Sequence, residues 1–406
     1  MLVSRDSMSA VARIVFIGLL LPACSVIDAL GGGGDDDDSR CPEDVCYDFA
    51  DTYSASGATH VAVGPFDERG AIDLATVDGD ADVIFFFDDE TAGDPGRAFI
   101  EDTGFSFPAG SVTDLASGDV DDDGMFELLG GRIDVDGTTF LVDQIGFGMS
   151  ARTAGIAGTP TQLVADDFDG DGFHDVAVAS GTDVIVLFGT ANGFDSTFET
   201  LTVGFSINGL ARGEFDGSNG PDIAVMTTIP DNQIQLFFNN GAGTFQAGTP
   251  FRPCLDACPG GGTETEDTLL MAAGDFEQNG IDDLVVLVSC RSSCSSQYDE
   301  LRFLLGDGGG DFSRHSELDM TGFGTTVLTT GQLDDDGSVD IAWQNNEDVG
   351  TLKLLHGNYF TGDGEYTTLE QDGSPIEMLV HDLNLDGLGD IITLRDGHLD
   401  VTLSQR

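Results

Sequence analysis

The chain has 406 residues and carries 73 acidic side chains against 15 Lys and Arg, which gives a net charge of −58 at pH 7. It contains a single lysine, Lys353, and no basic cluster, so nucleic acid, polyanionic glycans and anionic lipid surfaces are excluded as partners that bind through charge. Such an acidic surface favours solubility and cationic partners.

The amino-terminal segment has the pattern of an export signal. Arg5 and Arg13 flank its start, the apolar run 14–21 follows, and Pro22-Ala23-Cys24 closes it. This ending resembles the bacterial lipobox, which implies cleavage before Cys24 and lipidation of that cysteine; an ordinary signal peptide cut elsewhere is the alternative. Neither this run nor a later one is long enough to span a bilayer. We expect a lipoprotein signal peptide at 1–23 and a chain anchored by its lipid to the cell envelope, at the outer membrane or cell surface.

Residues 24–40 have the composition of a tether. Four glycines, 31–34, precede four aspartates, 35–38, and this flexible, self-repelling stretch cannot bury apolar surface. All repeats described next share one period, so we expect residues 41–406 to form one domain.

A nine-residue acidic phrase occurs seven times in that domain. Its clearest copy runs from Asp167 to Asp175 and leads into the apolar run 176–179. The last acidic residue of each copy recurs at a spacing typical of repeat proteins, at Asp73, Glu127, Asp175, Asp222, Asp283, Asp340 and Asp390.

The phrase has the chemistry of a calcium loop. Oxygen side chains at positions one, three, five and nine converge on one point, and glycine at position six allows the φ > 0 turn around it. The carbonyl of position seven completes a shell of hard oxygens that suits calcium. A solvated Asx-rich turn without metal is the alternative for a single copy, and the repetition argues against it.

The six predicted calcium sites can be ranked by the charge and chemistry of their ligands. Two loops offer four carboxylates: Asp119, Asp121, Asp123, Met125 and Glu127; and Asp167, Asp169, Asp171, Phe173 and Asp175. Two replace a carboxylate by an amide: Asp275, Glu277, Asn279, Ile281 and Asp283; and Asp382, Asn384, Asp386, Leu388 and Asp390. The two weakest contain a neutral or poor ligand: Glu214, Asp216, Ser218 and Asp222; and Gln332, Asp334, Asp336, Ser338 and Asp340.

The first copy differs from the other six. It contains Pro65, Asp67, Arg69 and Asp73, so a guanidinium stands at the fifth position and can pair with the aspartates in place of an ion. We predict no metal in this loop.

The apolar runs after the phrases predict the fold. Runs 223–226, 284–287 and 391–394 are continuously apolar over strand length, as expected for strands buried on both faces. Each repeat has room for four short strands, and four-stranded units repeated radially form a propeller. We predict an all-β, seven-bladed β-propeller of four-stranded blades with calcium-binding loops. A β-helix is the alternative, but its rungs repeat at shorter intervals.

The pattern Asp-x-Asp-x-Asp-Gly-x-x-Asp, preceded by 163–166 and followed by 176–178, resembles the FG-GAP or VCBS repeat family, whose repeats also form the head of integrin α subunits. The segment 234–245 also resembles the third strand and following turn of that family. The resemblance covers nearly everything after residue 44. It implies a β-propeller with one blade per repeat and calcium-binding loops, and it does not imply a catalytic activity.

The two ends of the domain complement each other. Residues 398–403 match only the third strand of the last blade, while residues 47–54 precede the first repeat and lack a blade. We predict that the amino-terminal segment supplies the missing outer strand and closes the ring.

Six cysteines remain after Cys24, and they fall in close pairs: Cys41 and Cys46, Cys254 and Cys258, Cys290 and Cys294. In an exported chain they predict disulfides that brace local loops, with open connectivity. A zinc site is the alternative, but no histidine lies near any pair in sequence. The last two pairs lie in long connections that strand parity places opposite the calcium loops, where we expect partner binding.

Catalytic motifs are absent from the sequence: it contains no His-Glu-x-x-His, no Gly-x-Ser-x-Gly and no phosphate-binding loop. We therefore expect a monomeric binding, adhesion or scaffolding module for a protein or glycan. A polysaccharide lyase or hydrolase is the alternative, which a central pocket with converging Arg, His and carboxylate groups would favour. A purely structural envelope protein is the third hypothesis.

Overall fold

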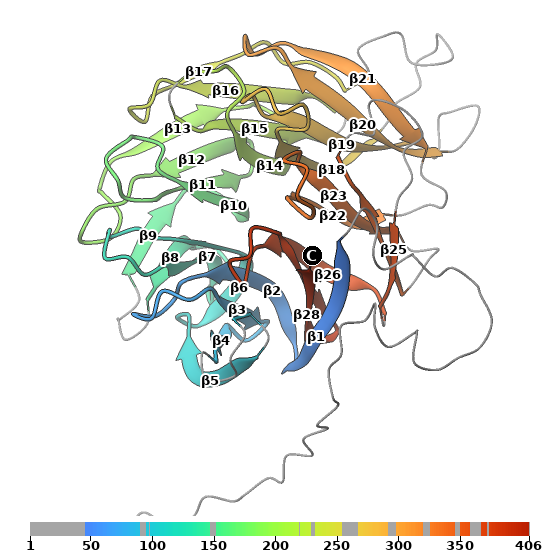
Figure 1. Cartoon of the computed structure of the whole chain (residues 1–406). Helices are drawn as coiled ribbons and strands as arrows, with labels where there is room; N and C mark the ends of the chain where they lie inside the picture. Colours follow the sequence, from blue (N-terminus) through green and yellow to red (C-terminus); the bar gives the residue numbers. More distant parts are fainter. Residues whose placement is uncertain are drawn as a thin grey trace, which may run out of the picture.

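The apolar run after each acidic phrase forms the second strand of a four-stranded antiparallel sheet, and seven such sheets surround a centre (Figure 1). The predicted all-β, seven-bladed propeller of four-stranded blades is thereby confirmed. The computed structural model describes residues 45–89, 95–96, 98–146, 152–218, 220–228, 232–253, 267–290, 298–319, 325–345, 350–357, 367–371 and 373–405.

The strands of the seven blades occupy equivalent places from the centre outward. The first strands, which contact one another around the centre, are β2 (Ala58–Gly64), β6 (Gly110–Gly118), β10 (Pro160–Asp166), β14 (Ile207–Gly213), β18 (Asp267–Gly274), β22 (Thr325–Gly331) and β26 (Pro375–His381). The second strands are β3 (Asp73–Asp78), β7 (Glu127–Asp134), β11 (Asp175–Ser180), β15 (Asp222–Thr227), β19 (Asp283–Cys290), β23 (Asp340–Asn345) and β27 (Asp390–Arg395). The third strands are β4 (Asp82–Asp88), β8 (Phe140–Ile145), β12 (Asp183–Leu187), β16 (Ile234–Asn239), β20 (Tyr298–Gly306), β24 (Thr351–Leu355) and β28 (Gly397–Gln405). The outer strands are β5 (Phe99–Ser106), β9 (Arg152–Ile156), β13 (Phe198–Thr202), β17 (Phe245–Ala247), β21 (Phe312–Asp319), β25 (Thr367–Glu370) and β1 (Cys46–Ala55).

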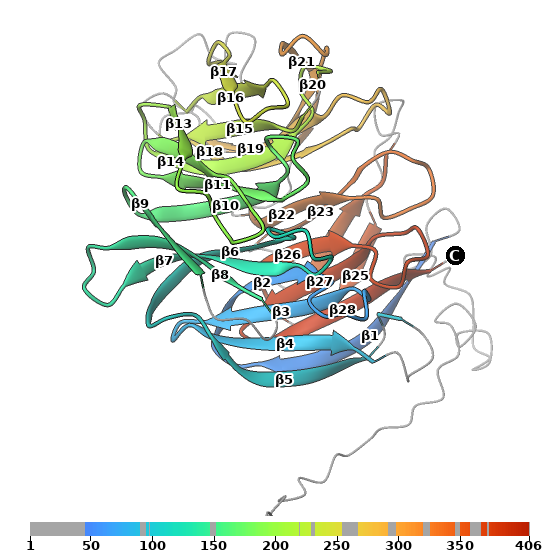
Figure 2. The same cartoon turned by 90° about the vertical axis from the view of Figure 1, so that its left-hand side faces the viewer.

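The second strands are buried on both faces, as their unbroken apolar runs predict. All six residues of β11 and all six of β15 are buried. Apolar side chains of neighbouring blades meet in shared clusters, so each blade covers the next, and the sheets stand side by side around the ring (Figure 2). A single blade could not bury both of its faces alone.

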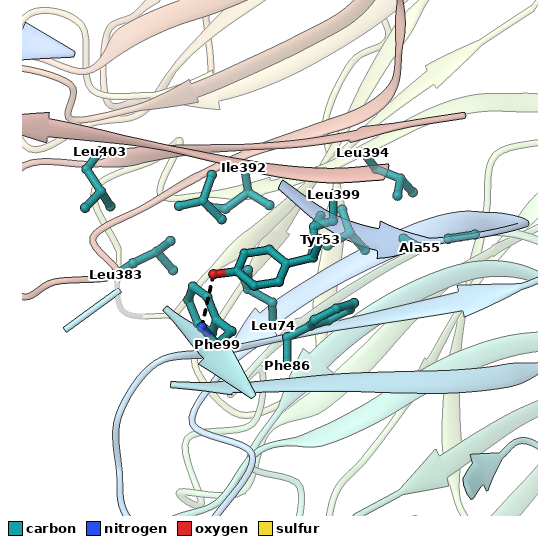
Figure 3. Packing of buried hydrophobic residues seen from close by; sticks show 13 residues of the cluster. Tyr53, Ala55, Leu74, Phe86, Phe99, Leu383, Ile392, Leu394, Leu399 and Leu403 are labelled. Carbon is teal, nitrogen blue, oxygen red and sulfur yellow. Dashed lines mark hydrogen bonds between the residues drawn. The ribbon is translucent and has the colours of Figure 1, made fainter. Parts of the chain in front are cut away.

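The predicted ring closure is confirmed. β1 pairs antiparallel with β28, from Cys46 opposite Gln405 to Ala55 opposite Gly397, and completes the seventh blade. Tyr53 of β1 lies within the apolar cluster shared by the seventh and first blades (Figure 3). Its hydroxyl oxygen accepts a 3.0 Å hydrogen bond from the backbone N–H of Phe99 in the first blade.

Every first strand contains a β-bulge at the same place. The register shifts near the strand start, for example between Ala58 and His60 in β2 and between Pro375 and Glu377 in β26. A bulge re-aims the residues that follow it. The residue after the bulge is polar in four blades, and in three of them it builds the central cluster described below.

The predicted signal peptide, Cys24, the tether and Cys41 lie outside the described residues, as do Cys254, Cys258 and Cys294. Cys46, at the start of β1, is disulfide-bonded. Cys290 ends β19, and the connectivity of the six cysteines stays a prediction. The part of the chain that the structure describes contains no helix with the length and apolar character needed to cross a membrane.

Candidate metal centres in the blade loops

All seven acidic phrases lie in the loop between the first and second strands of a blade, and position nine of each phrase is the first residue of the second strand. In β10 and β11, for example, Asp166 pairs with Asp175 at the mouth of the loop. Because the seven blades share one strand order, the loops share one face of the propeller. We call this the loop face.

The ninth carboxylate ties each loop to its own blade. The Oδ2 of Asp175 accepts a 2.8 Å hydrogen bond from the N–H of Phe168, and its Oδ1 accepts one of 2.7 Å from Gly189, just after the third strand. The corresponding pair of bonds occurs in five other blades, at Asp73, Asp222, Asp283, Asp340 and Asp390. Burial raises the pKa of Asp175 to about 7, so this carboxylate is costly to ionise without a nearby positive charge.

The carboxylate at position one and the glycine at position six shape the loop. The Asp167 carboxylate accepts hydrogen bonds from the N–H groups of Gly170, Asp171 and Gly172, at 2.7, 3.2 and 3.0 Å. Gly172, at position six, has φ +97°, which confirms the predicted left-handed glycine. The acidic side chains are thus held facing inward by the loop's own backbone.

Three loops bring three carboxylates together. In blades two, three and four, positions one, three and nine each offer an oxygen within 4.8 Å of the others; the groups are Asp119, Asp121 and Glu127; Asp167, Asp169 and Asp175; and Glu214, Asp216 and Asp222. The sequence ranked the Glu214 loop among the weakest because its fifth ligand is poor. Its other carboxylates nevertheless converge within the same 4.8 Å as those of the richest loops.

Two oxygens in these groups are buried without a hydrogen-bond partner among the described residues, Oδ1 of Asp121 and Oε1 of Glu214. Buried polar atoms are nearly always paired, so these atoms fit ligands of a cation. Oδ2 of Asp121 receives a 3.2 Å hydrogen bond from Arg152 on the outer strand of the same blade. The spacing of residues in the sequence did not predict the contact between Arg152 and Asp121.

The loops of blades five and seven keep the same backbone hydrogen bonds around Asp275 and Asp382. Within the described ranges, neither brings three carboxylates within 4.8 Å of one another. Each contains an amide, Asn279 or Asn384, at a ligand position. An amide oxygen remains a calcium ligand but adds no charge.

Blade six differs from the other predicted sites. The Nε2 of Gln332, at position one, donates a 2.8 Å hydrogen bond to the backbone oxygen of Asp334. The acidic group here consists of Asp334 and Asp340 and is joined by His356, which follows the third strand. The sequence analysis missed His356, although its place in the repeat is otherwise apolar.

Blade one carries its own cation. Arg69 donates from Nε to Oδ2 of Asp67 at 2.6 Å and from NH1 to the backbone oxygen of Asp88 at 3.2 Å. Its guanidinium also lies over the Phe87 ring, 5.6 Å from the centroid. This arrangement supports the prediction that Arg69 takes the place of a metal ion.

A second titratable cluster lies between the first strands of blades seven, one and two. The Nδ1 of His60 lies 3.7 Å from Asp114 and 3.6 Å from Glu377. Both carboxylates already bind the next blade: Glu377 accepts from the N–H of Val61 at 3.0 Å, and Asp114 from that of Leu163 at 2.6 Å. Burial raises the pKa of Asp114 to about 7. The cluster therefore serves blade-to-blade contact.

No protein-family model matches this chain, and no curated protein matches it. Among solved structures, the chain is similar to one in the crystal structure of BBS1N in complex with ARL6DN soaked with mercury, with a TM-score of 0.59, and to one in the same complex soaked with lead, with a TM-score of 0.58. Both matches have 11% sequence identity and cover 89% of this chain and 97% of the other. At this identity the likeness shows the propeller fold alone.

Proposed function

We propose that this chain is a calcium-stabilised propeller that binds a protein or glycan outside the cytoplasm and is anchored to the envelope through a lipid on Cys24. The observation that carries the calcium proposal is the convergence of three carboxylates in each of blades two, three and four. The buried oxygens of Asp121 and Glu214 support it, because a cation would supply their missing partner. The resemblance to FG-GAP and VCBS repeats supports the same ion.

A binding role is favoured over catalysis by the central cluster. His60, Asp114 and Glu377 are the His and carboxylate groups that come together between the first strands, and both carboxylates accept backbone N–H groups of a neighbouring blade. These hydrogen bonds give both carboxylates a structural role in holding neighbouring blades together. The similar solved chain comes from a complex with a protein, ARL6DN, which supports a protein as partner here.

Calcium uptake by the full chain tests the proposal. Equilibrium dialysis should show several bound equivalents, and the melting temperature should rise with millimolar calcium and fall with chelator. Each calcium site of the extracellular type should raise the free energy of unfolding by at most about 3 kcal/mol when the calcium concentration exceeds its Kd by about 100-fold. Magnesium should substitute poorly, because it demands tighter octahedral geometry.

A loop variant and a matched control make the test specific. D167N combined with D169N should remove one equivalent and lower the melting temperature only when calcium is present. D183N, on β12 of the same blade and outside the loop, should keep the full uptake. The calcium proposal would be refuted if the chain took up no calcium and its melting temperature did not change with calcium.

A further inference from the structure

One residue at or near the end of the third strand has a repeated chemistry. It immediately precedes the residue whose backbone N–H donates a hydrogen bond to the carboxylate at position nine. It therefore lies beside the loop. In five blades this residue is Phe or Leu: Phe87, Phe188, Phe238, Leu305 and Leu403. In blade six it is His356, which precedes Gly357, the donor to Asp340. An imidazole thus replaces an apolar side chain in one blade.

The same blade lacks the carboxylate at position one of its loop. Gln332 stands there and is hydrogen-bonded to the loop backbone. His356, Asp334 and Asp340 each offer one atom within 4.8 Å of the others, and Nδ1 of His356 lies 3.4 Å from Oδ2 of Asp334. His356 therefore occupies the place in the group that the first carboxylate has in blades two to four. The aspartates are 4% and 0% exposed, so the group is enclosed.

Tyr47 holds the other side of the imidazole. Its hydroxyl oxygen lies 3.4 Å from Nε2 of His356 and 3.5 Å from the backbone oxygen of Leu333. When the hydroxyl donates to Leu333, its oxygen can accept a hydrogen bond from Nε2–H, which leaves the lone pair on Nδ1, the nitrogen that lies 3.4 Å from Oδ2 of Asp334. Histidine ligands of metals are commonly oriented by such a partner on their second nitrogen.

We propose that the blade-six loop binds a divalent transition-metal ion of the Zn²⁺ class through Asp334, Asp340 and Nδ1 of His356. One imidazole nitrogen and two carboxylate oxygens are a zinc-type donor set, with water in the fourth position. Calcium is a hard cation that prefers oxygen ligands, and this loop lacks the carboxylate at position one that calcium would use. The site does not depend on calcium in the other loops.

Zinc uptake in excess calcium tests the site on the full chain, with its thiols alkylated to remove cysteine ligands. In equilibrium dialysis against micromolar zinc and millimolar calcium, the wild type should retain one equivalent of zinc. H356L, which installs the leucine that blades five and seven carry, should lose that equivalent and still melt cooperatively in calcium. Y47F should bind zinc roughly 10-fold more weakly, because it frees the second ring nitrogen.

The control is H398N, whose histidine is exposed on β28 and should leave zinc uptake unchanged. Zinc binding by H356L equal to that of the wild type would overturn the assignment. So would a wild type that takes up no zinc, since His356 would then be an internal cationic partner of Asp334, as Arg69 is of Asp67. If the wild type binds zinc but takes up no calcium, the proposed calcium function is refuted and the blade-six zinc site is supported.

Discussion

Arg69 holds Asp67 through two nitrogens, with its Nε 2.6 Å and its NH2 2.5 Å from the same carboxylate oxygen. Asp67 is at the third position of the blade-one loop, where five of the other six blades have a carboxylate as a predicted ligand. Burial raises the pKa of the neighbouring Asp73 to about 7, and the positive charge of Arg69 opposes that rise. The guanidinium thus supplies to this loop the charge that we propose calcium supplies elsewhere.

Replacing Arg69 by alanine should destabilise the first blade by about 1–3 kcal/mol, because it leaves a largely buried carboxylate without a cation. The estimate is at the low end for a buried pair, since the Arg69 side chain is 39% exposed. Urea unfolding measures the loss, which calcium should not restore, because Pro65 offers no ligand at position one. R212A removes the more exposed pair with Asp166 and should cost at most about 1 kcal/mol. Equal losses in the two variants would contradict the special role of Arg69.

Tyr53 closes the ring by a hydrogen bond as well as by packing. Y53F keeps the ring within the cluster of Figure 3 but leaves the buried N–H of Phe99 without its acceptor, which should cost about 1–3 kcal/mol. Deletion of residues 44–55 removes β1 entirely, so it should lower the melting temperature far more. F49T is the matched control on the same strand, because Phe49 is 53% exposed, and it should change stability by about 0.5 kcal/mol or less. A deletion variant as stable as the wild type would refute closure by β1.

The sequence predicted the parts of this molecule that repeat. Asp175 and its six counterparts recur with one period, and this period marks the start of every second strand. Residues 47–54 were recognised as the closing strand because the seventh repeat was one strand short. Both inferences depend on local pattern and counting, and neither requires knowledge of side-chain packing.

Contacts that depend on sheet register were not predictable in this way. His356 reaches Asp334 only because β24 pairs with β23, which places the end of one strand beside the start of the other. Arg152 approaches Asp121 from an outer strand. His60, Asp114 and Glu377 come from three blades, and the bulge in each first strand determines where they point. An alignment of the seven repeats by strand, rather than by loop, is the signal that would have singled out His356.

The central cluster should make stability depend on pH. Asp114 has a folded-state pKa of about 7 because it is buried, above its ordinary value of 3.8. The folded chain therefore holds a proton that the unfolded chain has released, and the free energy of unfolding falls as pH rises from about 4 to 7. The pKa of His60 is also raised: burial lowers it, but the Glu377 carboxylate outweighs that effect, so its contribution is also lost as pH rises.

Melting in chelator between pH 5 and pH 8 measures this dependence. D114N, which keeps an oxygen for the N–H of Leu163, should reduce the loss of stability across that range by at most about 3 kcal/mol. D136N is the control, because hydrogen bonds from Thr138 and Thr139 lower the pKa of Asp136 to about 2 and it stays ionised throughout. If D114N and the wild type lose the same stability between pH 5 and pH 8, Asp114 does not titrate in this range.

The loop face of the propeller and the face opposite it should have different roles. Residue Cys46 enters β1 opposite Gln405, and the neighbouring Ser404 donates to Asp390 in the blade-seven loop, so the predicted tether joins the domain at the loop face. The segments that contain Cys254, Cys258 and Cys294 leave from the opposite end, where Asp267 pairs with Ser289. A lipid on Cys24 would therefore hold the loop face toward the membrane and present the cysteine-bearing segments outward. Extended connections on a rigid scaffold are common binding sites.

Serine at Cys254, Cys258, Cys290 and Cys294 should impair partner capture while calcium uptake and most of the stability remain, because short bridges restrict the unfolded chain little. Capture is measured with immobilised, calcium-loaded full chain on a glycan array and against purified envelope proteins. L385N is the control on the loop face: Leu385 is 67% exposed at φ +59°, a conformation that asparagine tolerates better, so capture should be unchanged. Undiminished capture by the serine variant would refute the proposed role of the cysteine-bearing segments, and loss of capture in L385N alone would place the binding surface on the loop face.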